Sequence, residues 1–397
     1  MHPSKDIVGS KGGELRDRKI VVGVTGSVAA IRSVDLVREL MRHGAEVRVV
    51  MSEEGAKLVT PQLFHWASGN EVITSLSGRI EHVELAQWAD AVVVAPATAN
   101  TLGKIAHAID DTPVTSVVSV ALGLKKPVAV VPAMHLSMYQ HLGVKENLEK
   151  LKAMGIEVVE PSVEEDKAKF PPVERVVDRM VSLLGPRDMH GLKVLVTAGP
   201  TVEPIDPIKH ITNPSTGKMG IAFARVAALR GADVCLIYGP GTETPPPGVK
   251  VIRVTTTREM KEAFDRELEN EPDIVVSAAA PQDFVVESPA PTKLRHDRET
   301  VLKLKPAPRI VDARVKERLP NACLIGFKAE HGVSDEELEQ VGRQKLLGDR
   351  LDIVVANDVA RPGAGFGTDT NEVVVLTHGL QQKLSGSKER IAREVLD

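Results

Sequence analysis

The sequence predicts an α/β protein with two doubly wound, Rossmann-like domains built on parallel sheets. Three observations carry this prediction. The order strand, turn, helix, Gly-Ala, strand occurs twice, beginning at "RKIVVGVTGS" (18–27) and at "LKVLVTAGPT" (192–201). The strand segments are apolar without alternation, which is typical of parallel strands covered by helices on both faces. The chain has 397 residues, enough for two domains that each bury a core.

In the first segment, "KIVVGV" is the first strand and a helical pattern follows from Val28 to His43. Gly44 ends that helix, because glycine readily adopts the left-handed conformation found after the last helical turn. "AEVRVVMS" (45–52) is the next strand. A further apolar strand, Ala91 to Ala95, leads into the polar loop "PATANT" (96–101).

In the second segment, "GKMGIAFARVAALRGADVCLIYGP" (217–240) again reads as helix, terminating glycine and strand. The break "LLGPRDMHG" (183–191) separates the two segments, because Gly-Pro interrupts the preceding helix. We therefore expect a flexible tail over 1–18, a first domain over 19–185 and a second over 186–397. Three long polar or glycine-rich loops are expected in the second domain, at 240–248, 288–299 and 361–371.

Composition excludes several classes of function. The net charge is −4 with both signs mixed, and aromatic residues make up 3%, which argues against nucleic-acid binding. The two cysteines, Cys235 and Cys323, lie in apolar runs and are expected to be buried free thiols, without a disulfide framework or a cysteine-ligated zinc site. This pattern fits a reducing cytoplasm. No run approaches the roughly 20 apolar residues of a membrane span, and the N-terminal segment lacks the apolar core of a secretory signal.

Small polar residues follow several predicted strands of the first domain. "GVTGS" (23–27) joins a strand to a helix, where exposed N–H groups bind anions, although it lacks the GxGxxG spacing of a dinucleotide site. Ser52 and the "PATANT" loop end two other strands, at the sheet edge where α/β proteins bind ligands. Together these loops predict a phosphate-bearing cofactor. Taken singly, each remains compatible with an ordinary capped helix start.

The second domain offers a comparable set. "TAGPT" (197–201) follows its first strand, and "ITNPSTGKMG" (211–220) presents an amide, hydroxyl groups, a lysine and glycines before a helix. The Walker A spacing is missing. These residue types suit a nucleotide or an acyl phosphate, and an elaborate helix cap is the alternative.

From about Arg18 onward, the chain resembles bifunctional coenzyme A biosynthesis proteins, which fuse a phosphopantothenoylcysteine decarboxylase to a phosphopantothenate–cysteine ligase. The decarboxylase-like motifs are "GVTGSVAA", "HVEL", "PATANT" and "PAMHLSMY". The ligase-like motifs are "TAGPTVEPIDPIKHITNPSTGKMG", "SAAAPQDF", "TKLR", "GFKAE" and "ANDV".

For the first domain, the resemblance implies a flavodoxin-like fold with FMN held between the subunits of a trimer. His82 matches the family's catalytic histidine, and it would meet the polar loop across a subunit boundary. His135 and Met138 match substrate-contacting positions. The implied FMN-binding residues are Gly26, Ser27, Val28, Ser52, Thr98 and Asn100.

Two positions of the first domain depart from the family pattern. His135 stands where the family usually has an asparagine that contacts the substrate carboxylate. The flap "EPSVEEDKAKFPPVERV" (160–176) lacks the cysteine that protonates the enethiol in bacterial members. Either Lys167, Lys169 or another acid replaces that cysteine, or the last step of the decarboxylase is impaired.

For the second domain, the resemblance implies CTP and Mg²⁺, with the carboxylate of 4′-phosphopantothenate activated as an acyl-cytidylate before cysteine attacks. Asn213 and Lys293 match catalytic positions, Lys209 stands where arginine is expected, and the metal ligands stay open. The implied nucleotide-binding residues are Gly199, Asp283, Lys293, Phe327 and Lys345.

The sequence thus predicts an enzyme that ligates cysteine to 4′-phosphopantothenate with CTP and decarboxylates the product to 4′-phosphopantetheine with FMN. Trimers of the first domain joined by dimers of the second would give a dodecamer, and no nucleic acid or membrane partner is expected. The main alternative is an active ligase fused to an impaired FMN-binding domain. A different flavin enzyme, a non-catalytic FMN-binding regulator and a nicotinamide oxidoreductase are less consistent with the motifs.

Overall fold

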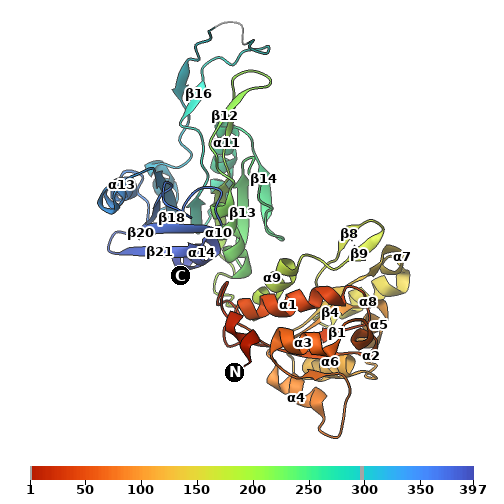
Figure 1. Ribbon diagram of the computed structural model, residues 1–397. Helices are drawn as coiled ribbons and strands as arrows, with labels where there is room; N and C mark the ends of the chain where they lie inside the picture. The colour runs from red at the N-terminus through yellow and green to blue at the C-terminus, as the bar shows by residue number, and fades with distance from the viewer. Residues whose placement is uncertain (1, 296–298) are drawn as a thin grey trace. The chain divides into compact units, whose positions relative to one another are not determined.

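The computed structural model describes residues 2–295 and 299–397. The chain divides into two compact units between Pro186 and Arg187, one residue after the boundary that the sequence predicts. Each unit is built around its own sheet (Figure 1).

The first unit contains a six-stranded sheet in the order β3-β2-β1-β4-β5-β7. Every neighbouring pair is parallel, as the unbroken apolar runs predict. Since β1 lies between β2 and β4, the strand order reverses direction at β1, and the loops after β1 and β4 flank that switch point. The strands are β1 (Lys19–Val24), β2 (Glu46–Met51), β3 (Val72–Ile73), β4 (Ala91–Ala97), β5 (Val128–Pro132) and β7 (Glu157–Val158).

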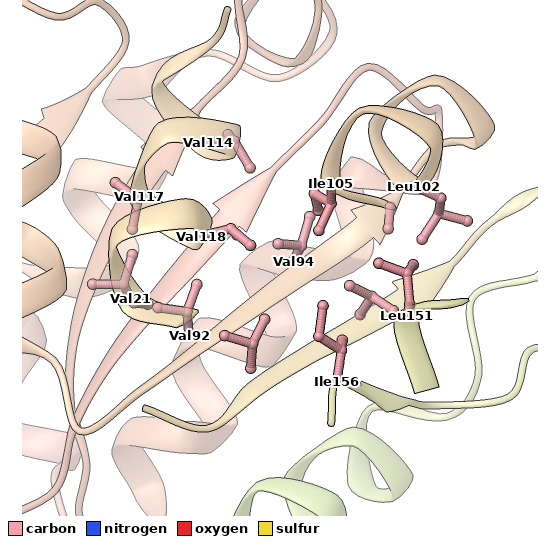
Figure 2. Packing of buried hydrophobic residues seen from close by; sticks show 14 of the residues in the cluster. Val21, Val92, Val94, Leu102, Ile105, Val114, Val117, Val118, Leu151 and Ile156 are labelled. Atoms are coloured by element: carbon pink, nitrogen blue, oxygen red, sulfur yellow. The ribbon is translucent and has the colours of Figure 1, made fainter. Parts of the chain in front are cut away.

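Helices cover both faces of this sheet. On one face, Val21, Val92 and Val94 pack against α4, α5, α6 and α8, as Figure 2 shows for part of the cluster. On the other, α1 packs between α3 and α9. The helices are α1 (Ala30–Arg42), α2 (Glu53–Leu58), α3 (Pro61–Ser68), α4 (Glu81–Trp88), α5 (Ala99–Ala106), α6 (Pro113–Gly123), α7 (Leu136–Tyr139), α8 (Leu142–Ala153) and α9 (Val173–Leu184).

The N-terminal segment is folded onto the first unit. A short 3₁₀ helix, η1 (Pro3–Ile7), packs against α1 and α3. The Gly9 N–H donates to the Met41 carbonyl at 3.0 Å, and Leu15 is fully buried. The prediction of a flexible tail is therefore wrong for residues 2–18, because a single leucine anchors a segment that otherwise reads as polar and unstructured.

A small antiparallel sheet follows β5 and forms the flap of the first unit. Its order is β6-β9-β8, and His135 lies directly opposite Lys167. The turn between β8 and β9 places Glu165 and Asp166 in the left-handed region, with φ of 48° and 55°. The strands are β6 (Met134–His135), β8 (Ser162–Glu164) and β9 (Lys167–Lys169).

The second unit contains an eight-stranded sheet in the order β14-β13-β10-β15-β18-β19-β20-β21. Six strands are parallel, as the sequence predicts, and β20 and β21 extend the sheet with antiparallel pairing. The strands are β10 (Lys193–Ala198), β13 (Asp233–Tyr238), β14 (Lys250–Arg253), β15 (Ile274–Ser277), β18 (Cys323–Glu330), β19 (Ile353–Asp358), β20 (Thr370–Leu376) and β21 (Gln381–Ser387).

Two helix layers enclose the second sheet. The helices α10 and α14 pack on one face, and α11, α12 and α13 pack on the other. Cys235 and Cys323 are free and half-buried at strand positions, rather than fully buried as expected. The helices are α10 (Lys218–Leu229), α11 (Thr257–Glu267), η2 (Leu268–Asn270), α12 (Ala313–Arg318), α13 (Asp335–Gly348) and α14 (Lys388–Leu396).

Two short hairpins extend from the second unit. One pairs β11 (Val202–Pro204) with β12 (His210–Thr212), and the other pairs β16 (Phe284–Val286) with β17 (Leu304–Pro306). The buried Asp206 carboxylate joins them, because it accepts the Leu294 N–H at 2.9 Å while pairing with the ammonium of Lys209 on its own hairpin. Part of the polar loop predicted at 288–299 is thus held in place, and its residues 296–298 lie outside the described residues.

Candidate functional sites

The first unit has a cavity of about 470 Å³ beside the switch point of its sheet. The loops after β1, β2, β4 and β5 all contribute to it, as expected for the carboxyl edge of a parallel sheet. The lining residues are Gly26, Ser27, Ser52, Glu53, Glu54, Thr98, Ala99, Asn100, Thr101, Lys104, Thr112, Ala133, Met134 and Met138.

The loop after β1 is fixed by a buried threonine. The Thr25 hydroxyl donates to the Pro96 carbonyl at 2.7 Å and accepts the Thr98 N–H at 3.2 Å, so it connects the loops after β1 and β4. Gly26 has no room for a side chain, since a Cβ there would lie 2.6 Å from the Cβ of Glu54. Glycine at this position therefore lets the loop after β1 pack closely against the start of α2.

The predicted hydroxyl residues each stabilise a local turn. Ser52 caps α2 by accepting the Gly55 N–H at 3.1 Å, and Thr98 caps α5 by accepting the Thr101 N–H at 3.2 Å. Ser27 Oγ accepts the Ala29 N–H at 3.3 Å. The capped-helix interpretation and the ligand interpretation are thus both compatible with the geometry, because each hydroxyl also lines the cavity.

A second cavity of about 790 Å³ lies between the flap and the start of α1, and we call it the flap cavity. It shares Ser27, Ala133 and Met134 with the first cavity, so the two spaces adjoin. Its lining residues are Ser27, Val28, Ala29, Ile31, Arg32, Ala133, Met134, His135, Ser162, Glu164, Lys167, Ala168, Lys169, Phe170, Pro171, Pro172 and Glu174.

His82 lies near the start of α4 and lines neither cavity. Its Nδ1 is buried and has no hydrogen-bond partner among the described residues. The preceding Ile80 adopts φ of 51°, which is uncommon for a β-branched residue and often marks a functional segment. Hydrogen bonds from Ser77 are the main cause that lowers the pKa of Glu81 to about 2, so this carboxylate stays ionised while it holds the turn before His82.

The second unit has a cavity of about 750 Å³, also beside the switch point of its sheet, between β10 and β15. Its lining residues are Asn213, Pro214, Ser215, Gly217, Lys218, Met219, Ser277, Ala278, Ala279, Ala280, Pro281, Gln282, Asp283, Pro306, Ala307, Pro308, Arg309, Ile310, Val311, Phe327, Lys328, Ala329, Lys345, Asn357, Ala364, Gly365, Phe366, Asn371 and Lys388.

Asn213 fixes one wall of this cavity. Its Nδ2 donates to the carbonyls of Ala280 and Pro281, each at 3.1 Å. The next residue along the wall, Gln282, donates its N–H to the Thr201 hydroxyl at 2.9 Å. The segment after β15 is therefore held rigidly from two sides, as a ligand-positioning wall requires.

Cationic side chains outnumber carboxylates in the lining of the second unit's cavity. Five of its lining residues are cationic, namely Lys218, Arg309, Lys328, Lys345 and Lys388, whereas Asp283 is its one lining carboxylate among the described residues. Arg309 and Lys345 both pair with the buried Asp349, at 2.7 and 2.9 Å. Such a set of shared cations suits a polyanionic ligand, which can replace or join the carboxylates already present.

Both halves of the chain match known protein families. The family described as Flavoprotein matches residues 8–185, and the DNA/pantothenate metabolism flavoprotein C-terminal domain matches residues 189–397. The coenzyme A biosynthesis bifunctional protein CoaBC of Thermococcus kodakarensis is 46% identical over 403 residues, covering 100% of this chain and 98% of its own. The Escherichia coli protein of that name is 36% identical over 376 residues. The match covers 90% of this chain and 90% of the Escherichia coli chain.

The chain belongs to the family of bifunctional coenzyme A biosynthesis proteins. It is an enzyme of coenzyme A biosynthesis with a phosphopantothenoylcysteine decarboxylase half and a phosphopantothenate–cysteine ligase half. Among solved structures, the C-terminal domain of a CoaBC protein matches 52% of this chain and 93% of its own, at 31% identity and a TM-score of 0.44.

The cavities contain most of the residues that the sequence singles out. The decarboxylase half brings Gly26, Ser27, Ser52, Thr98, Asn100 and Met138 into the first cavity, and Val28 and His135 into the flap cavity. The ligase half brings together Asn213, Asp283, Phe327 and Lys345. Phe327 is oriented by an edge-to-face contact with Phe223, with ring centres 5.5 Å apart.

Three ligase residues lie outside the cavity lining. Gly199 has φ of 79°, and a Cβ there would lie 3.0 Å from the Tyr238 ring, so the position favours glycine for a tight turn. Lys293 is exposed on the loop between β16 and β17. Lys209 pairs with Asp206 and donates to the Leu294 carbonyl at 3.0 Å, so its ammonium supports the hairpins.

Sequence reasoning missed Lys388, which opens α14. It is 6% exposed, and its Nζ donates to the carbonyls of Phe366 at 3.2 Å and Thr368 at 2.6 Å, and to that of Gly365. Burial is the main cause that lowers the pKa of this lysine. A buried lysine at a helix start had no local signal, since the sequence alone does not show which loop covers it.

None of the helices in the described ranges is long and apolar enough to cross a membrane. Within those same ranges, no group of three or more histidine, cysteine or acidic side chains is arranged to hold a metal ion.

Proposed function

We propose that the decarboxylase half uses FMN and that the first cavity holds its phosphate. The observation that carries this proposal is that Gly26 and the hydroxyl residues Ser27, Ser52 and Thr98, from three different loops, line one cavity at the carboxyl edge of the sheet. Small residues with hydroxyl and N–H donors fit a phosphate monoester. The adjoining flap cavity, with Val28 and apolar surface around it, would take the flavin ring and the substrate.

A bound flavin supplies the electron sink that a cysteine carboxylate lacks when carbon dioxide leaves. The protein's own contribution is to orient the substrate and to move protons. His82 is the proposed proton-transfer residue, since its buried Nδ1 has no partner among the described residues. Because His82 lines neither cavity of its own subunit, the proposal includes a trimer in which it completes a neighbouring site.

We propose CTP with Mg²⁺ as the nucleotide of the ligase half. The five cations of its cavity would balance a triphosphate, and Phe327 offers an aromatic edge for the base. Asn213 and Asp283 would position the acyl-cytidylate, and Mg²⁺ would be held largely by the triphosphate, as is common for this ion. Lys293, on its exposed loop, would contribute after that loop approaches the ligand. Ligase dimers joining decarboxylase trimers would give a dodecamer.

Mass spectrometry of the products tests both halves together. Purified protein with 4′-phosphopantothenate, cysteine, CTP and Mg²⁺ is expected to yield 4′-phosphopantetheine. Accumulation of 4′-phosphopantothenoylcysteine would instead favour an active ligase with an impaired flavin domain. That second candidate is favoured by one observation, namely that both cysteines, Cys235 and Cys323, belong to the ligase half.

His82→Asn is expected to abolish carbon dioxide release by removing the proton-transfer group, with a loss on the order of hundredfold or more. Flavin absorbance should stay at the wild-type level, since His82 does not line the phosphate cavity. The matched control is His65→Asn, on α3 of the same unit and outside both cavities. Undiminished release by the His82 variant would remove it from the mechanism.

A further inference from the structure

The flap cavity contains two cationic or proton-donating side chains on facing strands. His135 on β6 is directly opposite Lys167 on β9, and both line the cavity. Directly opposed residues of an antiparallel pair project from the same face of the sheet, with Cβ atoms about 5 Å apart. The two side chains therefore lie within reach of a single small group.

The hydrogen bonds of His135 fix which ring nitrogen carries the proton. The Ser137 N–H donates to His135 Nδ1 at 3.3 Å, and Ser137 Oγ lies 2.9 Å from the same nitrogen. A nitrogen that accepts a backbone N–H has no proton of its own, so the neutral ring carries its proton on Nε2. His135 thus offers Nε2–H as a donor, and no described residue accepts from it.

The two lysines of β9 differ in their partners. Lys169 pairs with Glu165 at 2.7 Å and with Glu164 at 3.4 Å. Glu164 lies opposite Lys167 in the β8–β9 pairing, yet its carboxylate reaches Lys169 instead. Lys167 forms no ion pair with any described residue, so Lys167 and His135 are two exposed side chains whose ammonium and Nε2–H no described side chain engages, although Glu164 and Glu174 also line the cavity.

We propose that His135 and Lys167 together bind an anionic group of the decarboxylase substrate. The inference rests on the proposed function, and it identifies Lys167 as a binding residue that the motifs do not assign. A substrate with a carboxylate at one end and a phosphate at the other has two groups of this chemistry. Two donors on adjacent strands suit either, because both anions accept several hydrogen bonds at once.

Ligand binding to the FMN-loaded full chain tests the pair without turnover. The probes are 4′-phosphopantothenoylserine, which lacks the thiol, and its counterpart without the carboxylate, 4′-phosphopantothenoyl-ethanolamine. Changes in flavin absorbance report binding at the decarboxylase half alone. Lys167→Met is expected to weaken binding by about tenfold to a hundredfold, and Lys167→Arg should recover most of it. His135→Phe provides a second, independent variant.

The two probes identify the anion. A loss confined to the serine compound assigns the pair to the carboxylate, and an equal loss for both compounds assigns it to the phosphate. Unchanged affinity in Lys167→Met and His135→Phe overturns the proposal. So does an equal loss in Lys145→Met, which removes an exposed positive charge from α8 of the same unit. If the wild-type flavin spectrum responds to neither compound, the proposed function of this half fails as well.

Discussion

At the scale of single residues, many side chains of the candidate sites also form hydrogen bonds with nearby backbone groups. Ser52 and Thr98 cap helices, and Asn213 holds two carbonyls, while each also lines a cavity. This double use explains why hydroxyl and amide residues at strand ends were informative in the sequence. A hydroxyl oxygen accepts an unpaired N–H group at a helix start, and the same hydroxyl can donate its hydrogen to an anionic ligand.

The thiol of Cys235 leads to a prediction about reactivity. Burial is the main cause that raises its pKa from the ordinary 9.0 to about 12, with the Glu267 carboxylate adding to the effect. We expect alkylation by iodoacetamide at pH 9 to be at least about a hundredfold slower in the folded protein than in guanidinium, because the thiolate is the reactive form. Peptide mass spectrometry after timed quenching separates Cys235 from Cys323.

The raised pKa of Cys235 also makes the free energy of unfolding depend on pH. The folded thiol holds its proton more tightly than the unfolded one, so this contribution is fully present below pH 9 and is lost as the pH rises toward the raised pKa near 12. Equal alkylation rates in folded and unfolded protein at pH 9 would contradict the assignment of a buried, neutral thiol.

At the scale of secondary-structure elements, the start of α14 organises the glycine-rich loop of the ligase cavity. Lys388 donates to carbonyls of this loop, and the Thr216 hydroxyl, just before α10, donates to the Phe366 carbonyl at 3.1 Å. The loop between β19 and β20 is thus attached to the first turns of two helices.

Lys388→Met should release this loop while keeping the length of the side chain. We expect the free energy of unfolding to fall by about 1–3 kcal/mol, since buried carbonyls lose their donors. Hydrogen exchange should rise over residues 363–369, and CTP should bind more weakly. Lys383→Met, which removes an exposed lysine of β21 that pairs with Asp335, is the matched control. A loop that keeps its wild-type exchange in Lys388→Met would show that other contacts suffice.

The ends of helices were predictable where a single residue type determines the local backbone conformation. Gly44 and Gly231 follow α1 and α10 with φ of 103° and 91°, as their place after each helix predicts. The antiparallel pair β20–β21 was not predictable in the same way, since "NEVVVL" is as apolar as a parallel strand and only the short turn at 377–380 distinguishes it. The roles of Lys388 and Lys167 were not predictable for a related reason. The groups that each side chain contacts, or fails to contact, belong to segments that are distant in the sequence.

At the scale of the whole molecule, each half has its own sheet, core and cavity. The division between Pro186 and Arg187 separates two hydrophobic systems, one around β1 and β4 and the other around β10 and β15. The predicted ligase residues follow the same division, since the four that meet in the cavity come from a single unit. His82, the predicted catalytic histidine, lines neither cavity of the first unit.

Separate expression of residues 1–186 and 187–397 should therefore give two folded proteins. We expect the first to retain flavin absorbance and the second to form 4′-phosphopantothenoylcysteine from 4′-phosphopantothenate, cysteine and CTP. Circular dichroism should show a cooperative thermal transition in each. A cut at 150, inside α8, is the control and should yield an unfolded first fragment, since it removes β7, α9 and two of the three flap strands, β8 and β9. Failure of both halves to fold would contradict their independence.

The two outer strands of the ligase sheet are polar where another chain would attach. β21 presents Gln381, Gln382 and Lys383 to solvent, and β14 follows three consecutive prolines at 245–247. Exposed charges and prolines at a sheet's margin hinder edge-to-edge addition. Concentrated solutions of this half should accordingly resist amyloid-like growth from these two margins.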